Sequence, residues 1–369
     1  MSCLFHQGPP APSAWQPGGA LPSTASQEPP ISQNLPLPAP VIVTGCAGFI
    51  GARVCQHLLA AGQPVLGLDN LNDAYDVRLK TWRLAQLEHQ PGFTFERLDI
   101  GDRPALRNLL TARQRQPGPA GEFAAIINLA ARAGVRPSVD DPWAYLETNV
   151  TGALNLLEAC REFDIPKFVL ASSSSLYGQS TNLPYREDQS TDRPLSPYAA
   201  SKKAAEALCY AYHHLHGLDI SVLRYFTVYG PAGRPDMAPL RFVQWISEGR
   251  PVTIFGDGQQ SRDFTYVDDI ARGTIAALRP LGYQVINLGS DAPVILLDVI
   301  RLVERLVQRP AQLIFRPAHA ADVPATWADI SLARRLLAWQ PQTSLEEGFT
   351  HLAAWYQANR AWASQIVTQ

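Results

Sequence analysis

The chain has 369 residues, of which 46% are apolar and 17% charged, so it is long and apolar enough for one large α/β unit with a smaller lobe. The formal net charge of −2 argues against nucleic acid or an anionic membrane as partner, and no apolar stretch is long enough to span a bilayer. The five cysteines have no paired spacing and no residues form a metal-ligand cluster, so we expect free thiols, a cytoplasmic location and no metal.

Residues 1–39 are rich in Pro, Gly, Ser, Gln and Ala, with nine prolines and no Lys or Arg. This composition predicts a solvated, mostly extended tail. Secretory signals and transit peptides need basic residues, so neither is indicated. Recognition of the Pro-rich tail by a partner is the alternative reading.

The segment 41–51, VIVTGCAGFIG, begins with the apolar run of a buried strand and continues into a helix starting near Phe49. Gly45 permits a tight turn, Gly48 lets a ligand approach the backbone, and Gly51 lets the helix pack closely against the strand. A strand, a glycine turn and a helix N-terminus in this order favour the binding of a dinucleotide pyrophosphate.

A second apolar run, 64–68, ends in Asp69, eighteen residues after Gly51. A carboxylate at this strand end can accept hydrogen bonds from an adenosine ribose and would repel a 2′-phosphate. The sequence therefore predicts NAD, in preference to NADP, as the cofactor.

From residue 41 onward, short apolar runs alternate with longer helical patterns. The predicted strands are 41–44, 64–68, 93–98, 124–129, 167–171 and 220–225, and the predicted helices are 49–61, 75–88, 102–115, 143–162 and 197–216. This alternation is typical of an α/β fold with a Rossmann-like, doubly wound parallel sheet. We expect 40–225 to form the NAD-binding domain. Residues 226–365 should form mainly a smaller α/β substrate lobe, from which some segments return to the sheet. In this region 252–255 and 285–288 are strand-like, and 296–308 and 345–360 are helical.

The predicted strand 167–171 runs into four serines, and Tyr198 and Lys202 follow one helical turn apart on the same face of a predicted helix. A free tyrosine has a pKa of about 10, so it is a poor base at neutral pH. A lysine ammonium and an oxidised nicotinamide nearby would favour the phenolate, and Ser173 would hold the substrate hydroxyl. Ser173, Tyr198 and Lys202 are therefore the candidate catalytic residues.

These motifs resemble the extended short-chain dehydrogenase/reductases, and among them the nucleotide-sugar epimerases, especially those acting on UDP-glucuronate. The matching stretches include DNLNDAYDVRLK (69–80), NLAARAGVRPSVDDPWAY (128–145), RYFTVYGPAGRPDM (224–237), SRDFTYVDDI (261–270) and DVPATWADIS (322–331). The resemblance covers about 40–365. It implies an NAD-dependent 4-epimerase that converts UDP-glucuronate to UDP-galacturonate through a transient 4-keto sugar.

The resemblance also implies roles for single residues. The NAD-binding residues would be Gly45, Gly48, Phe49, Ile50, Asp69, Asn70, Asp99, Ile100, Leu129, Ala130, Ala131 and Lys202. The residues that bind the UDP-sugar would be Asn149, Ser174, Phe226, Thr227, Arg234 and Arg262. Arg262 would hold the diphosphate, which suits a guanidinium fork, whereas Asn149 is also explained as a structural amide within a helix.

Arg234 is the residue that would recognise the sugar acid. Glucuronate carries a carboxylate at C6, and a buried carboxylate needs a charge partner. Arg234 lies in the matching segment GRPDM. Two features keep UDP-glucose and UDP-N-acetylglucosamine 4-epimerases as alternatives. Ala232 occupies a position that is often large or basic in the glucuronate enzymes, and the loop 255–263 has the form common to bacterial sugar epimerases.

Three further functions are compatible with this fold. A UDP-glucuronate decarboxylase would share the 4-keto intermediate and stays an alternative. A 4,6-dehydratase needs an Asp-Glu pair where this chain has Ser174-Ser175, which argues against it, and an NAD-sensing scaffold would often have lost Tyr198 or Lys202. The family commonly forms dimers through a four-helix bundle, so the resemblance implies a homodimer built from 143–162 and 197–216.

Overall fold

The computed structural model describes residues 36–115, 122–318 and 323–368. Most of the predicted tail lies outside these residues, but its last part contacts the fold. The Gln63 side chain accepts a hydrogen bond from the Leu37 N–H at 2.5 Å and donates one to the Ala39 carbonyl at 2.9 Å. The folded part of the chain therefore begins before residue 40, earlier than the composition indicated.

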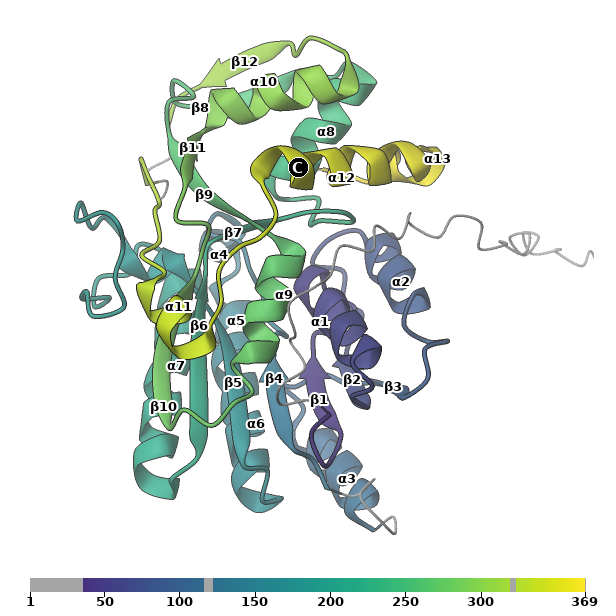
Figure 1. Cartoon of the computed structure of the whole chain (residues 1–369), viewed down its shortest axis with the longest axis vertical. Coiled ribbons are helices and arrows are strands. Elements are labelled where there is room, and N and C mark those ends of the chain that lie inside the picture. The colour runs from purple at the N-terminus through teal and green to yellow at the C-terminus, as the bar shows by residue number, and fades with distance from the viewer. Residues whose placement is uncertain (1–35, 116–121, 319–322, 369) are drawn as a thin grey trace, which may run out of the picture. The chain divides into compact units, whose positions relative to one another are not determined.

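Seven strands form the central sheet in the order β10-β6-β5-β4-β1-β2-β3, and all of them pair in parallel (Figure 1). Their bounds are β1 (Val41–Thr44), β2 (Val65–Asp69), β3 (Phe93–Arg97), β4 (Ala125–Asn128), β5 (Lys167–Ser173), β6 (Asp219–Tyr225) and β10 (Tyr283–Leu288). The six predicted strands are confirmed. The order reverses between β1 and β4, and ligands of such sheets bind outside the carboxyl ends at this point.

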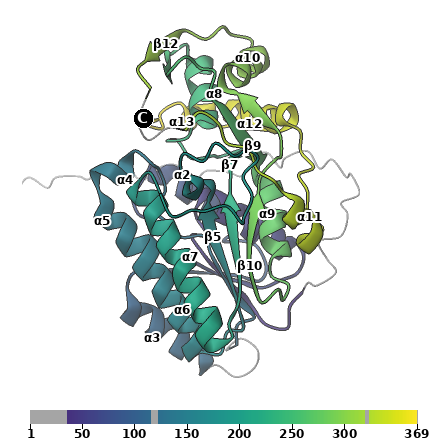
Figure 2. The same cartoon turned by 90° about the vertical axis from the view of Figure 1, so that its left-hand side faces the viewer.

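Helices cover both faces of the sheet (Figures 1 and 2). Successive residues of β1 face opposite sides, since Val41 and Val43 belong to one apolar core and Ile42 to another. The first core includes residues of α1 (Phe49–Ala60), α9 (Val267–Ala276) and α11 (Ser331–Leu337), and the second includes residues of α3 (Arg103–Gln114), α6 (Gly152–Glu162) and α7 (Pro197–His216). The predicted doubly wound fold is therefore confirmed.

The helix α7 has the bounds that the sequence predicted. The Ser196 hydroxyl caps its N-terminus by accepting the Ala199 N–H at 3.2 Å, Pro197 occupies the first turn, and Gly217 ends the helix with a φ of +67°. The predicted helix 143–162 instead consists of three pieces: α5 (Pro142–Tyr145), the π-helical η3 (Leu146–Thr151) and α6.

Most of the C-terminal elements form a lobe around a third apolar core, to which Phe49 of α1 and Leu79 also belong. They include the sheet β11-β9-β7, formed by Pro293–Ile295, Ser261–Tyr266 and Thr227–Tyr229, and the pair β12-β8, formed by Leu313–Arg316 and Val252–Phe255. The helices are α8 (Ala238–Glu248), α10 (Leu296–Val307), α12 (Leu345–Ala358) and α13 (Arg360–Ala363). The strand β10 joins the central sheet, and the helices α9 and α11 contribute to the apolar core on one face of it. Within the described residues, no helix is both long and apolar enough to cross a membrane.

Candidate active site

The glycine turn after β1 is packed so tightly that side chains are excluded. A Cβ on Gly45 would lie 2.7 Å from the Ala130 nitrogen, and one on Gly51 would lie 2.0 Å from the Gly45 carbonyl oxygen. Gly45 also has a φ of +69°, which glycine adopts without strain. The backbone of the turn and the N-terminus of α1 therefore border the pocket directly, an arrangement that suits a pyrophosphate.

Asp69, at the end of β2, fastens this turn to the loop that follows β2. Its carboxylate accepts the Ala47 N–H at 3.2 Å and the Leu71 N–H at 2.8 Å. The neighbouring Asn70 side chain donates to the Asp99 carboxylate at 2.7 Å. The acids that end β2 and follow β3 thus stand side by side at the carboxyl edge of the sheet, where the sequence predicted a ribose and adenine site.

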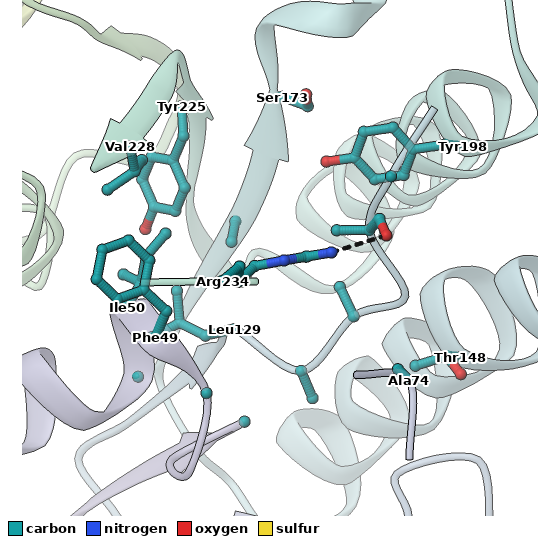
Figure 3. Close-up of a pocket in the computed structure, with 18 of the residues that line it drawn as sticks. Phe49, Ile50, Ala74, Leu129, Thr148, Ser173, Tyr198, Tyr225, Val228 and Arg234 are labelled. Atoms are coloured by element: carbon teal, nitrogen blue, oxygen red, sulfur yellow. Dashed lines mark hydrogen bonds between the residues drawn. The ribbon is translucent and has the colours of Figure 1, made fainter. Parts of the chain in front are cut away.

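One pocket with a cavity of about 320 Å³ brings most of the predicted residues together. All predicted NAD-binding residues line it, together with Ser173, Tyr198, Ser174, Phe226, Thr227 and Arg234. Figure 3 shows side chains from the start of α1, from β5 and from α7 around this pocket. The geometry therefore agrees with these assignments, although the binding roles of single residues stay predictions.

Ser173, Tyr198 and Lys202 lie at the meeting point of β5 and α7. The Lys202 ammonium donates a hydrogen bond of 2.8 Å to the carbonyl of Ala171 on β5, and the Tyr145 ring packs edge-on against the Tyr198 ring at 6.1 Å. These contacts hold the phenol and the ammonium in one corner of the pocket, next to the end of the strand.

Burial and neighbouring groups change the acidity of this pair. Burial raises the pKa of Tyr198, while hydrogen bonding with Ser173 and the positive charge of Arg234 oppose this rise. Burial also lowers the pKa of Lys202 to about 8, opposed by the negative charge of Glu206. The sequence pointed to the Lys202 charge as the group that favours the phenolate. In the structure the Lys202 ammonium faces the Ala171 carbonyl, and the groups that lower the Tyr198 pKa are Ser173 and Arg234.

Arg234 reaches into the pocket from the loop after β7 (Figure 3). Its Nη2 donates to the Ala133 carbonyl at 3.0 Å, and its Nε donates to the Asp236 carboxylate at 3.0 Å. Asp236 thus already compensates part of the guanidinium charge. Because Nη1 has no hydrogen-bond partner among the described residues, Arg234 keeps donors for a second carboxylate.

Asn149 was predicted to contact the substrate, with a structural amide as the other interpretation, and its hydrogen bonds favour the structural amide. The side chain is 4% exposed, does not line the pocket, and has all its bonds within the protein. Its oxygen accepts the Arg132 N–H, while its nitrogen donates to the Arg132 carbonyl and to the Ser201 hydroxyl, each at 2.9 Å. Asn149 therefore fixes the loop after β4 against α7, and it lies in the π-helical turn, a common feature near functional sites.

Arg262 also lies outside the residues that line the pocket. Its Nη1 donates to the Ser261 carbonyl at 2.8 Å and is 3.5 Å from the Pro324 carbonyl oxygen. The predicted contact of Arg262 with a diphosphate would therefore need a different side-chain orientation, and it stays a prediction.

Several residues that line the pocket were not predicted from the sequence, among them Tyr75 and Lys80. Lys80 is 5% exposed and donates to the Asn72 side chain at 2.8 Å, and burial lowers its pKa. Both residues lie in the stretch 69–80, which directly follows a strand end at the ligand edge of the sheet. Their position after this strand end could have identified them from the sequence as candidate pocket residues. No group of His, Cys, Asp or Glu in the part of the chain that the structure describes could hold a metal ion.

Comparisons with known proteins agree with this geometry. The profile of the NAD dependent epimerase/dehydratase family matches residues 41–289. A UDP-glucuronate 4-epimerase of Thermodesulfobacterium geofontis is 54% identical over 320 residues, covering 86% of this chain and 96% of the relative.

Two solved structures are also similar. The UDP-glucuronic acid 4-epimerase of Bacillus cereus, in complex with UDP-glucuronic acid and NAD, has 38% identity and a TM-score of 0.80, with 86% of this chain and 99% of the other covered. The UDP-glucose 4-epimerase of Thermotoga maritima, with UDP-glucose, has 28% identity and a TM-score of 0.78, with 87% and 99% covered.

Proposed function

Because the chain belongs to the NAD-dependent epimerase/dehydratase family, we propose that it inverts C4 of UDP-glucuronate to give UDP-galacturonate. The observation that carries the proposal is the Arg234 guanidinium, which lies in the same pocket as Tyr198 and Lys202. When the C4 of glucuronate faces Tyr198, the C6 carboxylate of this sugar acid needs a cation as its partner, and Arg234 supplies one.

The residues of the pocket fit NAD as the cofactor. The glycine turn brings the N-terminus of α1, whose first N–H groups have no partner within the helix, to the edge of the pocket, and Asp69 and Asp99 lie where an adenosine would need acceptors. NAD supplies an acceptor that takes the C4 hydride and returns it, so the overall reaction involves no net oxidation.

The chain's own residues perform the acid–base chemistry. The Tyr198 phenolate takes the proton of the sugar 4-hydroxyl, and the same phenol returns it after the transient 4-keto sugar has presented its other face. Ser173 hydrogen-bonds the hydroxyl and aligns it with Tyr198. Arg234 places positive charge near the phenolate, and together with the hydrogen bond from Ser173 this favours the ionised form.

Arg234 also has a protective role in this proposal. A 4-keto glucuronate is a β-keto acid that readily loses carbon dioxide when its carboxylate bond aligns with the ketone. A guanidinium held by Ala133 and Asp236 can fix the carboxylate out of that alignment.

Purified protein incubated with UDP-glucuronate and followed by proton NMR tests the function. Appearance of UDP-galacturonate supports the epimerase. Release of carbon dioxide would instead indicate a decarboxylase, and inversion of UDP-glucose or UDP-N-acetylglucosamine alone would indicate a different epimerase. Inertness toward all UDP-sugars, with NAD bound, would support a sensor.

We further propose that the enzyme acts as a homodimer in the cytoplasm. Large apolar side chains are exposed on and beside α5 and α7, including Trp143 at 71%, Leu146 at 42% and Tyr210 at 57%. The helices α6 and α7 lie side by side (Figure 2), so two copies could join as a four-helix bundle. Cys46, Cys55, Cys160 and Cys209 are free thiols, which suits a reducing compartment.

A further inference from the structure

Arg83 on α2 (Val77–Ala85) is a buried arginine, 3% exposed, that joins three segments around the active site. Its Nε and Nη2 donate to the Ala232 carbonyl at 3.0 and 2.7 Å, and Nη2 also donates to the Gly233 carbonyl at 3.2 Å. Its Nη1 donates to the Ala47 carbonyl at 3.2 Å and to the Tyr75 hydroxyl at 2.8 Å. The five hydrogen bonds use the full donor capacity of a guanidinium.

None of these acceptors is a carboxylate, and Arg83 makes no ion pair with the described residues. A guanidinium used in this way acts through its rigid, planar geometry, and a lysine ammonium cannot reproduce it. Arg83 does not line the pocket, so any effect on the reaction must pass through the residues that it holds.

The first of these segments is the turn that precedes Arg234. Ala232 is buried there with a φ of +51°, a left-handed conformation that costs energy for a residue with a Cβ. The three hydrogen bonds that Arg83 gives to the carbonyls of Ala232 and Gly233 stabilise this turn. Arg234 is the next residue in the chain, so the conformation of this turn sets the position of the Arg234 Cα and the direction of its side chain.

The second is Tyr75, which lines the pocket. The Arg234 guanidinium lies 5.7 Å from the centre of the Tyr75 ring, and the Arg83 guanidinium lies 5.5 Å from it. Because the Tyr75 hydroxyl accepts a hydrogen bond from Arg83, the ring is fixed on the side where Arg234 packs. Arg83 therefore supports Arg234 both through the backbone and through an aromatic neighbour.

We propose that Arg83 is a positioning residue for sugar-acid selectivity, which orients Arg234 toward the C6 carboxylate and ties that turn to the glycine turn through the Ala47 carbonyl. The inference rests on the proposed function, because it requires UDP-glucuronate as substrate. It predicts that a buried residue outside the pocket controls discrimination between sugars with and without the carboxylate.

The test measures dissociation constants of UDP-glucuronate and UDP-glucose for the NAD-loaded enzyme by calorimetry. In Arg83→Met and in Arg83→Lys, the wild-type preference for UDP-glucuronate should fall by about tenfold or more, the value of one charge-assisted hydrogen bond. In an Arg234→Met background, Arg83→Met should change the preference by less than about twofold, because the two residues act in series. Arg272→Met is the control, since Arg272 pairs with Asp269 and does not line the pocket; it should keep the preference.

The inference would be overturned if Arg83→Met and Arg83→Lys both kept the wild-type preference for UDP-glucuronate over UDP-glucose. It would also be overturned if these variants lost affinity for both sugars equally. Either result would leave the proposed function intact. A wild-type enzyme that binds both sugars equally would overturn the proposed substrate and the inference with it. If Arg83→Met fails to fold, Tyr75→Phe removes only the hydroxyl that Arg83 holds, and an unchanged preference in Tyr75→Phe and Arg83→Lys would likewise contradict the inference.

Discussion

Gly51→Ala should displace α1 from the glycine turn and release the cofactor. The new Cβ would lie 2.0 Å from the Gly45 carbonyl oxygen, 2.8 Å from the Gly45 carbonyl carbon and 3.1 Å from the Cys46 Cα. These are backbone atoms, so no side-chain rotation relieves the contact. A Cβ needs about 3 Å from such an oxygen, so the helix must move by about 1 Å or the turn must open.

Overpacking of this kind costs about 1–3 kcal/mol, from which the better helix propensity of alanine recovers about 0.5–1 kcal/mol. We therefore expect a lower melting temperature and an NAD affinity reduced by at least about tenfold, because the displaced atoms belong to the proposed pyrophosphate site. Chromatography of the nucleotide released from the purified protein measures NAD content, and thermal unfolding measures stability.

Gly62→Ala is the matched control, because its Cβ would meet no atom within 4 Å and only its φ of +76° opposes the substitution. It should cost about 1 kcal/mol of stability and leave NAD bound. If Gly51→Ala keeps the wild-type NAD content and melting temperature, the tight packing of this turn does not govern cofactor binding.

Three more substitutions test the substrate contact, the buried lysine and the proposed dimer interface. Arg234→Met should weaken UDP-glucuronate binding by about 10–150-fold, as expected for loss of a charge-assisted bond of about 1.5–3 kcal/mol, with little effect on UDP-glucose; calorimetry giving equal losses would contradict its role. Because burial lowers the pKa of Lys202 to about 8 from 10.5, the unfolded chain binds more protons between these values. Urea unfolding should therefore show wild-type stability rising relative to Lys202→Met by up to about 1.4 kcal/mol per pH unit above pH 8, and a constant difference below pH 8; a flat difference throughout would refute this. Trp143→Arg should convert the proposed dimer to a monomer in analytical ultracentrifugation, whereas an unchanged dimer would locate the interface elsewhere.

The order of the strands in the central sheet and of the helices between them could be predicted from the sequence, because most of these strands are short apolar runs and several of the helices have a local signal. The helix α7 is an example, with Ser196, Pro197 and Gly217 marking its ends. The cofactor side of the pocket was predictable for a related reason. Its residues sit at the carboxyl ends of parallel strands, and these ends necessarily meet at one edge of the sheet.

Residues whose roles depend on long-range contacts could not be assigned in this way. Asn149 matched a family position, but its partners Arg132 and Ser201 are visible only in three dimensions. Lys80 and Arg83 lie on one amphipathic helix, and nothing in the local pattern distinguishes a buried cation from a solvated one. Whether such a cation is buried or solvated depends on its contacts, and for Arg83 these reach segments up to 150 residues away.

Tyr198→Phe removes only the phenolic hydroxyl that the proposed mechanism uses for proton transfer. Inversion of UDP-glucuronate at C4, followed by proton NMR with the NAD-loaded variant, should slow by about 10²–10⁴-fold, the usual contribution of a positioned acid–base group, while UDP-glucuronate binding in calorimetry stays near the wild-type value. Inversion by Tyr198→Phe at the wild-type rate would contradict the assignment of Tyr198 as the catalytic base.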